Sequence, residues 1–500
     1  MTHRPNVLLL YTDQQRFDTI AALGNPFIQT PTLDRLVAEG TSFTSTYTPS
    51  PVCIAARCSL ILGQYAHQTG CTANLPMPQE RTSLMALLAA EGYQTHGAGK
   101  MHFWPDSHKL WGFGSRDYSE EGGMREGDDF CDHLRHHGFD HILDPNGVRS
   151  EWYYLPQPSQ LPARLHHSTW VADRSIEFLG RRDRARPFFL WSSFIKPHPP
   201  FESPVPWNRL YKPVEMPYPH VPRGHEQLLT YWNRLQNRYK YRDEGFDGNL
   251  VRLIRAAYYA AISFVDYNAG RILAALEHSG DLEHTLVMFA SDHGELLGDY
   301  DSYGKRSLLD PAARVPLLVR WPDRFTPGRR CERVVSTVDV MPTLLEAADI
   351  PVPGEAAGVD LAQVAEGQIE RDEVFTQYQE GGWGLFGITT GHYKYGYSAP
   401  DNREYLFRRE PGRLEERNLA GNAAYAEVLA DLRQRLVARL RHDGYETPLD
   451  GEGWKVWEEK TLPPEIDACR LFQEGQVDHL FPEGYEPRCK PAGGLPVHGI

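Results

Sequence analysis

Two apolar segments constrain the fold most strongly, because they lie far apart in the chain and each ends at an aspartate. Val7–Tyr11 is a continuous apolar run that leads to Asp13, and Thr285–Ala290 leads to Asp292. Short runs of this kind, apolar without alternation, are typical of parallel strands buried on both faces. Such sheets place functional groups at the carboxyl ends of their strands, so we expect both aspartates at that edge.

Helices and further strands alternate with these two segments. Residues 31–39 are predicted to form a helix, because a proline lies near its first turn and Gly40 follows its last residue. A further helix is predicted at 83–91, one long helix or two at 250–278, and further strands at 188–194 and 315–321. This alternation indicates an α/β fold, in which a mostly parallel sheet is covered by helices on both faces.

The sequence pattern changes after residue 375. Short polar and aromatic segments at 388–397 and 404–407 are predicted strands, and 423–441 is a predicted helix. At 500 residues the chain exceeds the size at which one hydrophobic core stops growing. We therefore expect a catalytic domain at 1–375 and a C-terminal subdomain at 376–500, with a small antiparallel sheet, a helix and an extended tail.

The tail, residues 448–500, is rich in proline, glycine and aromatic side chains. We expect the tail to wrap on the surface of the domain. A second hypothesis is that it covers a pocket or a neighbouring subunit, because its aromatic side chains would be unfavourable if they were exposed to water.

Charge and cysteine usage restrict the partners and the compartment. The formal net charge of −14 disfavours binding to nucleic acids and to anionic membranes, because the far field would repel both. No run approaches the roughly 20 apolar residues of a membrane helix, and we see no secretory signal before the first strand. The cysteines follow neither a disulfide-like nor a zinc-like spacing, which favours a reducing, cytoplasmic compartment. They are Cys53, Cys58, Cys71, Cys131, Cys331, Cys469 and Cys489.

Cys53 opens a predicted helix, after a proline-marked loop and four positions before Arg57. A helix N-terminus carries partial positive charge, so this position and the Arg57 cation favour an anionic group. Read alone, Cys53 is more often an ordinary buried cysteine, because free cysteines are among the most buried residues. Other segments of the chain decide between these two interpretations.

The segment Ser50–Gln64 resembles the signature of sulfatases in its CxAxR form, in which the cysteine is oxidised to formylglycine after translation. Four more segments resemble sulfatase segments and occur in the family's order along the chain. They are 6–16 and 289–295, which resemble the two metal-binding strands, and 97–102 and 195–201, which resemble catalytic segments. The resemblance covers at least residues 6–345 and implies the alkaline-phosphatase-like fold.

The resemblance implies one divalent metal ion, usually calcium, bound by Asp13, Gln14, Asp292 and His293, with the modified Cys53 completing its shell. Carboxylate, amide and imidazole groups suit a hard or borderline ion. Many sulfatases have a second aspartate at the position of Gln14 and an asparagine at that of His293. The lower charge and the imidazole move the preference toward manganese, the alternative to calcium. The same residue pairs also resemble those of phosphonate monoester hydrolases and choline sulfatases.

Catalytic roles come from the resemblance in the same way. The residues concerned are Cys53, Arg57, Lys100, His102, His198 and Lys305. Hydrated formylglycine at Cys53 is the implied nucleophile, and Arg57 and Lys100 would hold its diol. His102 would take a proton from the second hydroxyl as sulfate leaves. His198 and Lys305 would protonate or stabilise the leaving group.

The catalytic roles of the lysines and histidines in this set depend on the segments in which they occur. Read alone, the lysines would be solvated surface residues and the histidines ordinary core or loop residues. Their joint occurrence in Gly-Lys-x-His and Lys-Pro-His-Pro segments favours the catalytic interpretation. Lys305 has the weakest sequence support, because Lys109 and Lys196 offer nearby charge.

Two departures from the family pattern affect maturation. Sulfatases often continue with Leu-Thr-Gly-Arg after the signature, whereas this chain lacks the threonine and has Gln64 in place of the arginine. Ala55 stands where many family members have proline, which could restrict the formylglycine-generating enzyme that accepts the segment. That maturation enzyme is an expected partner of the chain.

The sequence predicts a sulfatase that hydrolyses a small anionic ester, a sulfate monoester of an aryl, carbohydrate or choline-like alcohol. One alternative is a phosphonate monoester or phosphodiester hydrolase with the same nucleophile. A less favoured alternative, of another class, is a non-catalytic binding protein with unmodified Cys53. The sequence leaves the oligomeric state open, with a dimer or tetramer among the expected assemblies.

Overall fold

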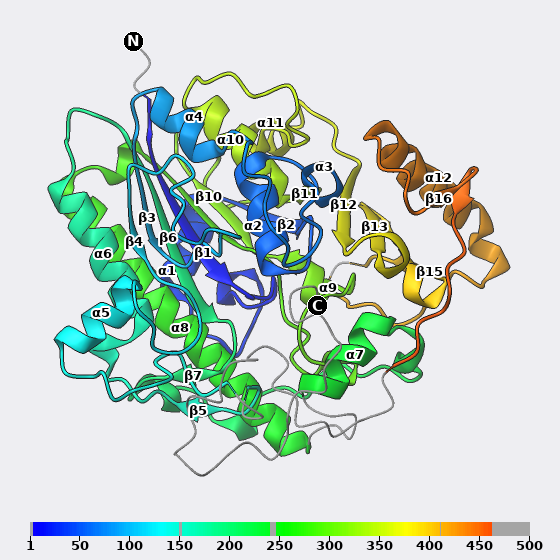
Figure 1. Cartoon of the computed structure of the whole chain (residues 1–500), viewed down its shortest axis with the longest axis horizontal. Helices are drawn as coiled ribbons and strands as arrows, with labels where there is room; N and C mark the ends of the chain where they lie inside the picture. The colour runs from blue at the N-terminus through cyan, green and yellow to red at the C-terminus, as the bar shows by residue number, and fades with distance from the viewer. Residues whose placement is uncertain (1–3, 150–152, 241–246, 411, 463–500) are drawn as a thin grey trace.

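The structure is a computed structural model that describes residues 4–149, 153–240, 247–410 and 412–462. Its centre is a large sheet with strand order β11-β2-β10-β8-β1-β6-β3-β4, in which β9 also pairs with β2 (Figure 1). The strands are β1 (Asn6–Asp13), β2 (Thr41–Tyr47), β3 (Gln94–Gly99), β4 (Ser115–Tyr118), β6 (Phe188–Pro197), β8 (Thr285–Ser291), β9 (Arg314–Val315), β10 (Leu317–Arg320) and β11 (Arg329–Ser336). Most neighbours pair in parallel, and β9 and β10 are the antiparallel members. The predicted α/β fold is therefore confirmed.

Helices cover both faces of the large sheet (Figure 1). One face packs against α1 (Pro31–Glu39), α5 (Asp129–His136), α6 (His167–Arg181) and α8 (Gly248–Ser279). The other packs against α2 (Cys53–Leu62), α4 (Leu84–Ala90), α10 (Val340–Ala347) and α11 (Leu361–Ala365). The two cores explain why residues 7–11 of β1 are apolar without alternation. Leu8 and Leu10 join the first core, whereas Val7, Leu9 and Tyr11 join the second.

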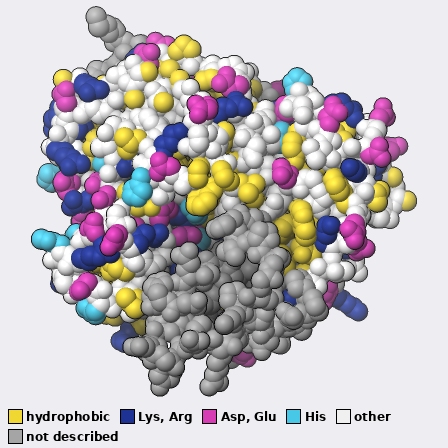
Figure 2. All heavy atoms as spheres, in the orientation of Figure 1, with side chains coloured by type: hydrophobic (Ala, Val, Ile, Leu, Met, Phe, Trp, Pro, Cys, Tyr) yellow, Lys and Arg dark blue, Asp and Glu magenta, His cyan; other side chains and the backbone are white. Residues whose placement is uncertain are grey.

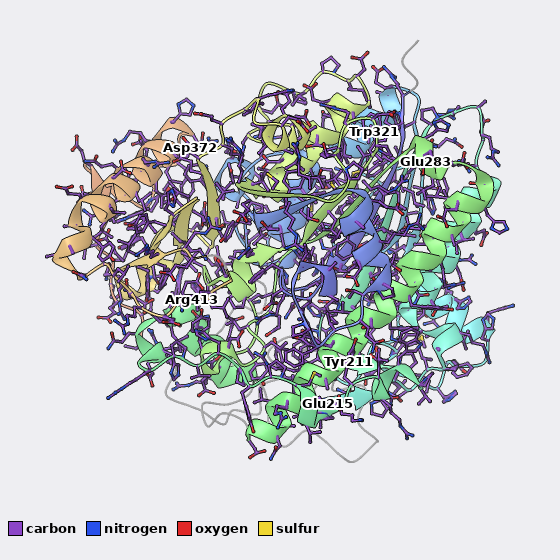
Figure 3. The ribbon with its side chains drawn as sticks, turned by 180° about the vertical axis from the view of Figure 1, so that it is seen from behind. Tyr211, Glu215, Glu283, Trp321, Asp372 and Arg413 are labelled. Carbon is purple, nitrogen blue, oxygen red and sulfur yellow. The ribbon has the colours of Figure 1, made fainter. Side chains whose placement is uncertain are left out.

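Several predicted elements lie where the sequence placed them. Helix α1 has the predicted bounds, and the segment 250–278 lies within the single helix α8. Figure 3 shows α8 crossing the back of the molecule, with Tyr211 and Glu215 near one end and Glu283 near the other. Asp266 of α8 accepts the backbone N–H groups of Thr32 (3.0 Å) and Leu33 (2.8 Å), so it caps the first turn of α1.

The prediction of one strand over 315–321 was wrong. The segment forms β9 and β10, which are separated by Pro316. Proline has no backbone N–H to donate, so it interrupts the ladder at this point. Both pieces still pair with β2.

A second, antiparallel sheet has the order β12-β13-β14-β15. Its strands are β12 (Glu373–Tyr378), β13 (Leu385–Thr390), β14 (Tyr393–Ser398) and β15 (Arg403–Arg408), and α12 (Ala426–His442) packs on it. The single strand predicted at 388–397 was wrong, because Gly391 and His392 form the turn between β13 and β14. The backbone hydrogen bond from Gln377 N to Pro49 O (2.9 Å) joins β12 of this sheet to the loop that follows β2 of the larger one. The division of the chain at residue 375 stays a prediction.

The described ranges contain further α-helices and strands. They are α3 (Ala66–Thr69), α7 (Tyr231–Lys240), α9 (Asp310–Ala313), β5 (Gln157–Pro158) with β7 (Glu202–Ser203), and β16 (Leu449–Asp450) with β17 (Gly453–Trp454). At the start of the tail, Trp454 stacks on Tyr397 at 4.5 Å between ring centroids. The rest of the tail from residue 463 onward, with Cys469 and Cys489, lies outside the described residues.

The face shown in Figure 2 is mixed in charge where its side chains are coloured. In the orientation of Figure 2, basic and acidic side chains alternate over the visible face without a large region of one sign. None of the helices in the described ranges has the length and apolar character that crossing a membrane requires.

Candidate active site

The candidate site lies at the carboxyl edge of the large sheet, where β1 and β8 end side by side. Thr12 pairs with Ser291, so Asp13 and Asp292 occupy neighbouring positions at the ends of the two strands. Both carboxylates are fully buried. The structure thus brings together two aspartates that are far apart in the sequence.

Cys53 is the first residue of α2 and points at these aspartates. Its Sγ lies 2.9 Å from Lys305 Nζ, 3.2 Å from His293 Nε2 and 3.7 Å from Asp13 Oδ1. Burial and the Asp13 charge raise the pKa of the Cys53 thiol, but the cations of Lys305 and Lys100 outweigh them and bring it well below its usual value. The position therefore favours an anion, as its sequence context predicts.

Four residues form a group that could bind a metal ion. Ligand atoms of Asp13, Cys53, Asp292 and His293 all lie within 4.8 Å of one another. Oδ1 of each aspartate faces His293 Nε2, at 3.8 Å for Asp13 and 3.6 Å for Asp292. Oδ2 of each aspartate faces Arg57 instead, which donates Nη2 to Asp13 (3.2 Å) and Nε to Asp292 (3.0 Å).

This donor set fits a divalent ion. Burial, and then repulsion from the nearby Asp13 carboxylate, raise the pKa of Asp292, although Arg57 binds the Oδ2 atoms of both aspartates. A positive ion bound by the two Oδ1 atoms and the imidazole would remove that repulsion. Oxygen donors with one imidazole suit calcium or manganese better than a soft ion.

Gln14 lies beside this group in a left-handed backbone conformation (φ 66°). Its backbone N–H donates to Asp292 Oδ1 (3.0 Å), and its side-chain Oε1 accepts from Lys305 Nζ (2.9 Å). Its Nε2 donates to Glu295. Gln14 therefore links the carboxylate pair to Lys305, and its amide oxygen is occupied by that lysine.

Arg57 and Lys100 lie behind the carboxylates and are completely buried. Arg57 Nη1 donates to Lys100 O (2.8 Å) and to Ser193 Oγ (3.1 Å). Lys100 Nζ bridges Asp13 Oδ2 (2.7 Å) and Glu121 Oε2 (2.6 Å). Burial lowers the pKa of Lys100, but Asp13 and Glu121 more than offset it, so the ammonium group stays charged.

The two histidines with predicted catalytic roles, His102 and His198, have different surroundings. His198 is buried, with Nδ1 2.7 Å from Pro199 O and 3.2 Å from a Glu121 oxygen, and with Nε2 3.5 Å from Tyr153 Oη. Burial, opposed by Glu121, lowers its pKa to about 4. His102 has a positive φ of 55°, and its ring Nδ1 has no hydrogen-bond partner among the described residues.

The structure shows which of the three lysines Lys109, Lys196 and Lys305 lies beside Cys53. Lys196 Nζ pairs with Glu202 (3.0 Å) and donates to the Pro200 carbonyl (2.7 Å), and Lys109 Nζ donates to the Gln79 carbonyl (2.7 Å). Of the three lysines compared, Lys305 alone contacts the Cys53 thiol within the described ranges.

Several residues at the site were missed by the sequence reasoning: Tyr11, Glu121, Ser193 and Glu295. Glu121 comes from the insertion between β3 and β6, where no motif marks it. Glu295 follows Asp292 by three positions, and this proximity was the one signal that could have drawn attention to it.

Family comparisons cover most of the chain. A family model described as sulfatase matches residues 5–350, and one described as N-sulphoglucosamine sulphohydrolase, C-terminal, matches residues 298–442. An arylsulfatase of Clostridium perfringens is 32% identical over 481 residues, which cover 88% of this chain and 96% of the relative. A choline-sulfatase of Rhizobium meliloti is 30% identical over 442 residues, which cover 84% and 83%.

Solved structures give a further match. The crystal structure of a phosphonate monoester hydrolase of Agrobacterium radiobacter superimposes with a TM-score of 0.77 and 25% sequence identity. The alignment covers 91% of this chain and all of that one. The similarity therefore extends over nearly the whole fold.

Proposed function

The chain belongs to the sulfatase family of sulfuric ester hydrolases, and on that premise we propose that it cleaves its sulfate monoester with a nucleophile formed at Cys53. One observation carries the proposal: Lys305, His293 and Asp13 all converge on the Cys53 sulfur at the start of α2. Oxidation of this side chain to formylglycine would provide a hydrated carbonyl whose hydroxyl attacks sulfur. A formylglycine-generating enzyme is then a required partner.

We propose that the divalent ion is bound by Asp13, Asp292, His293 and the modified Cys53. We propose calcium as the first choice. Manganese is the alternative, because the imidazole of His293 is a better ligand for manganese than for calcium. Such an ion would act as a Lewis acid and lower the pKa of the attacking hydroxyl. Gln14 would join the ligands only if its amide oxygen left Lys305.

The chain's own residues supply the remaining chemistry. Arg57 donates to Oδ2 of both Asp13 and Asp292. It therefore orients their Oδ1 atoms toward the position of the ion. Lys100 adds positive charge for the sulfate oxygens. His198 and Lys305 would donate a proton to the departing ester oxygen, and His102 would accept the proton that is released as sulfate leaves.

The substrate alcohol belongs to the aryl, carbohydrate or choline-like classes. The arylsulfatase and choline-sulfatase relatives support two of these classes. A phosphonate monoester or phosphodiester hydrolase is the second candidate, favoured by the structural match to such an enzyme. Initial rates on matched aryl sulfate and aryl phosphonate esters separate the two, and a large preference for the phosphonate would overturn the first.

The first experiment is a peptide mass spectrum of protein co-expressed with a maturation enzyme. Trypsin cleaves after Arg57, so Cys53 and Cys58 fall in different peptides, and the second cysteine serves as an internal control. We expect an aldehyde or its hydrate at Cys53 and an unchanged thiol at Cys58. An unmodified Cys53 in fully active protein would refute the proposed nucleophile. If the protein were inactive under conditions that convert another sulfatase, the non-catalytic binding protein would be favoured.

A second experiment tests the metal. After dialysis against a chelator, calcium or manganese is added separately, and both activity and bound metal are measured. We expect one equivalent of metal to bind and activity to return with it, and we expect Asp292→Asn to lower the bound metal. Full activity of protein shown to be free of metal would refute the site. The cytoplasmic location and self-association stay predictions from sequence.

A further inference from the structure

Glu121 occupies a central place among the cations of the site. It follows β4, and its side chain is 16% exposed, whereas Lys100 and His198 beside it are buried. Its Oε2 lies 2.6 Å from Lys100 Nζ and 3.2 Å from His198 Nδ1, and its Oε1 lies 3.6 Å from Arg149 Nη2. One oxygen atom therefore connects two residues to which the proposed function gives catalytic roles.

We propose that Glu121 is a positioning residue that orients His198 as the proton donor to the leaving group and holds Lys100 in place beside Asp13. This inference rests on the proposed function, in which His198 donates that proton. Glu121 acts through its neighbours and does not touch the ester.

The acceptors around His198 fix which ring nitrogen carries the hydrogen. Nδ1 faces two acceptors, Pro199 O at 2.7 Å and the Glu121 carboxylate at 3.2 Å, so we assign its hydrogen there. Nε2, 3.5 Å from Tyr153 Oη, is then the nitrogen that can exchange a proton with a substrate. Without the carboxylate, the Pro199 carbonyl would be the one acceptor left at Nδ1 among the described residues.

Electrostatics point in the same direction. Burial lowers the pKa of His198, Glu121 and Asp13 raise it, and Lys305 and Lys100 lower it. Burial raises the pKa of Glu121, but His198, Lys100 and Arg149 outweigh burial and bring it well below its usual value. The lowered pKa favours the ionised form of Glu121, and its negative charge partly offsets the lowering of the His198 pKa, so it favours the imidazolium form that can act as an acid.

The same charge has a cost for substrate binding. Lys100 lies between two carboxylates, and an incoming sulfate group must compete with Glu121 for it. Removal of the Glu121 charge should therefore weaken proton donation and strengthen anion binding. A residue with only a structural role would not change the two properties in opposite directions.

The test compares Glu121→Gln with Glu126→Gln, a control on the same segment whose side chain is exposed. Substrates are a series of aryl and alkyl sulfates with leaving alcohols of increasing pKa. We expect kcat of Glu121→Gln to fall about 10- to 100-fold for alkyl sulfates and much less for nitrophenyl sulfate, because a good leaving group needs no acid. The alkaline limb of the kcat profile should shift to lower pH, since loss of the anion lowers the pKa of His198.

Binding of inorganic sulfate to the holoenzyme gives a readout that is independent of turnover. We expect Glu121→Gln to bind sulfate more tightly than the unchanged protein and Glu126→Gln to bind it equally. Equal loss of kcat over the whole substrate series, or weaker sulfate binding, would refute the inference. Glu121→Asp, which keeps the charge, should recover part of the alkyl sulfate activity, and failure to recover any would count against it.

His198→Asn separates this inference from the proposed function. If His198→Asn shows the leaving-group dependence and Glu121→Gln does not, the role of Glu121 is wrong and the acid assignment stands. If His198→Asn shows no such dependence, the acid assignment in the proposed function is wrong, and the role given to Glu121 is wrong with it.

Discussion

Buried charged side chains gather in two regions of this molecule. One is the active site around Cys53. The other, the junction cluster, lies where the small sheet meets the large one and consists of Tyr47, Asp310, Arg314, Lys394 and Glu415. Both contain a buried lysine between two carboxylates: Lys100 with Asp13 and Glu121 in the site, and Lys394 with Asp310 and Glu415 in the junction cluster.

The junction cluster pairs its groups with one another. Lys394 Nζ donates to Leu308 O (2.7 Å), to Glu415 Oε1 (2.5 Å) and to Asp310. Tyr47 Oη donates to Asp310 Oδ1 (2.9 Å), and Asp310 N donates to Glu415 Oε1 (3.0 Å). Every side-chain polar atom of the cluster that is buried has a partner within the described structure.

The active site leaves polar groups without partners. Tyr11 Oη and His102 Nδ1 find no hydrogen-bond partner in the part of the chain that the structure describes. Oδ1 of both Asp13 and Asp292 faces the imidazole of His293. The ammonium group of Lys305 faces the Cys53 thiol. Burial of charge is therefore common to both regions, and convergence on one reactive atom is what distinguishes the site. Charges in the junction cluster should contribute to stability, and charges in the site to catalysis.

The largest expected effect comes from Cys53→Ala. Loss of the proposed nucleophile should lower kcat/KM by on the order of 10⁴- to 10⁶-fold, while the melting temperature changes little because the side chains are similar in size. Cys58→Ala is the matched control, since Cys58 is buried in the same helix and should keep its activity. Turnover that survives in Cys53→Ala would refute the proposed nucleophile. The distinction between the active site and the junction cluster would then fail, because the charges of the site would not converge on a reactive atom.

Lys394→Met should have the next largest effect, and on stability. Two carboxylates would lose their shared cation in a buried place, which costs about 3–5 kcal/mol of the free energy of unfolding. Urea unfolding measures this loss, and the activity of the folded protein at low temperature should remain. Lys212→Met, at a side chain 74% exposed, should change neither. Lost activity at unchanged stability would show that the junction cluster participates in catalysis.

The fold was predictable from the sequence where the pattern is local. The apolar run of β1 and the proline and glycine that bound α1 identify their elements directly. The errors arose where a single residue changes the path of the chain. Pro316 separates β9 from β10, and the turn at Gly391 reverses the chain inside one aromatic segment.

The site was predictable to the extent that its residues follow strand ends and family motifs. The parallel sheet predicted that Asp13 and Asp292 lie at the same edge, and the pairing of β1 with β8 in the structure makes them neighbours. Glu121 could not be predicted, because it comes from an insertion and meets Lys100 and His198 only through the tertiary fold. The sequence also could not rank Lys305 over other lysines, because that choice depends on which one reaches Cys53.

Lys305→Met makes the same substitution in the active site that Lys394→Met makes in the junction cluster. The two variants therefore compare the two regions directly. We expect kcat/KM to fall about 10²- to 10³-fold, as for loss of one donor to a developing charge, with little loss of stability. In the unconverted protein, the pKa of Cys53 should rise when this cation is removed. The ultraviolet absorbance of the thiolate should then appear at higher pH than in the unchanged protein. Equal losses of stability in the two methionine variants would contradict the distinction between the regions.

The smallest effects should come from a pair of tyrosines. Tyr47→Phe removes the hydrogen bond to Asp310 and leaves a buried carboxylate short of a donor, which should lower the free energy of unfolding by about 1–3 kcal/mol. Tyr11→Phe removes a hydroxyl that has no partner among the described residues, so its stability should be unchanged or slightly higher. Urea unfolding of both variants measures the difference. A larger loss at Tyr11 would mean that its hydroxyl makes a stabilising interaction at the site, and the contrast between the two clusters would then fail at this position.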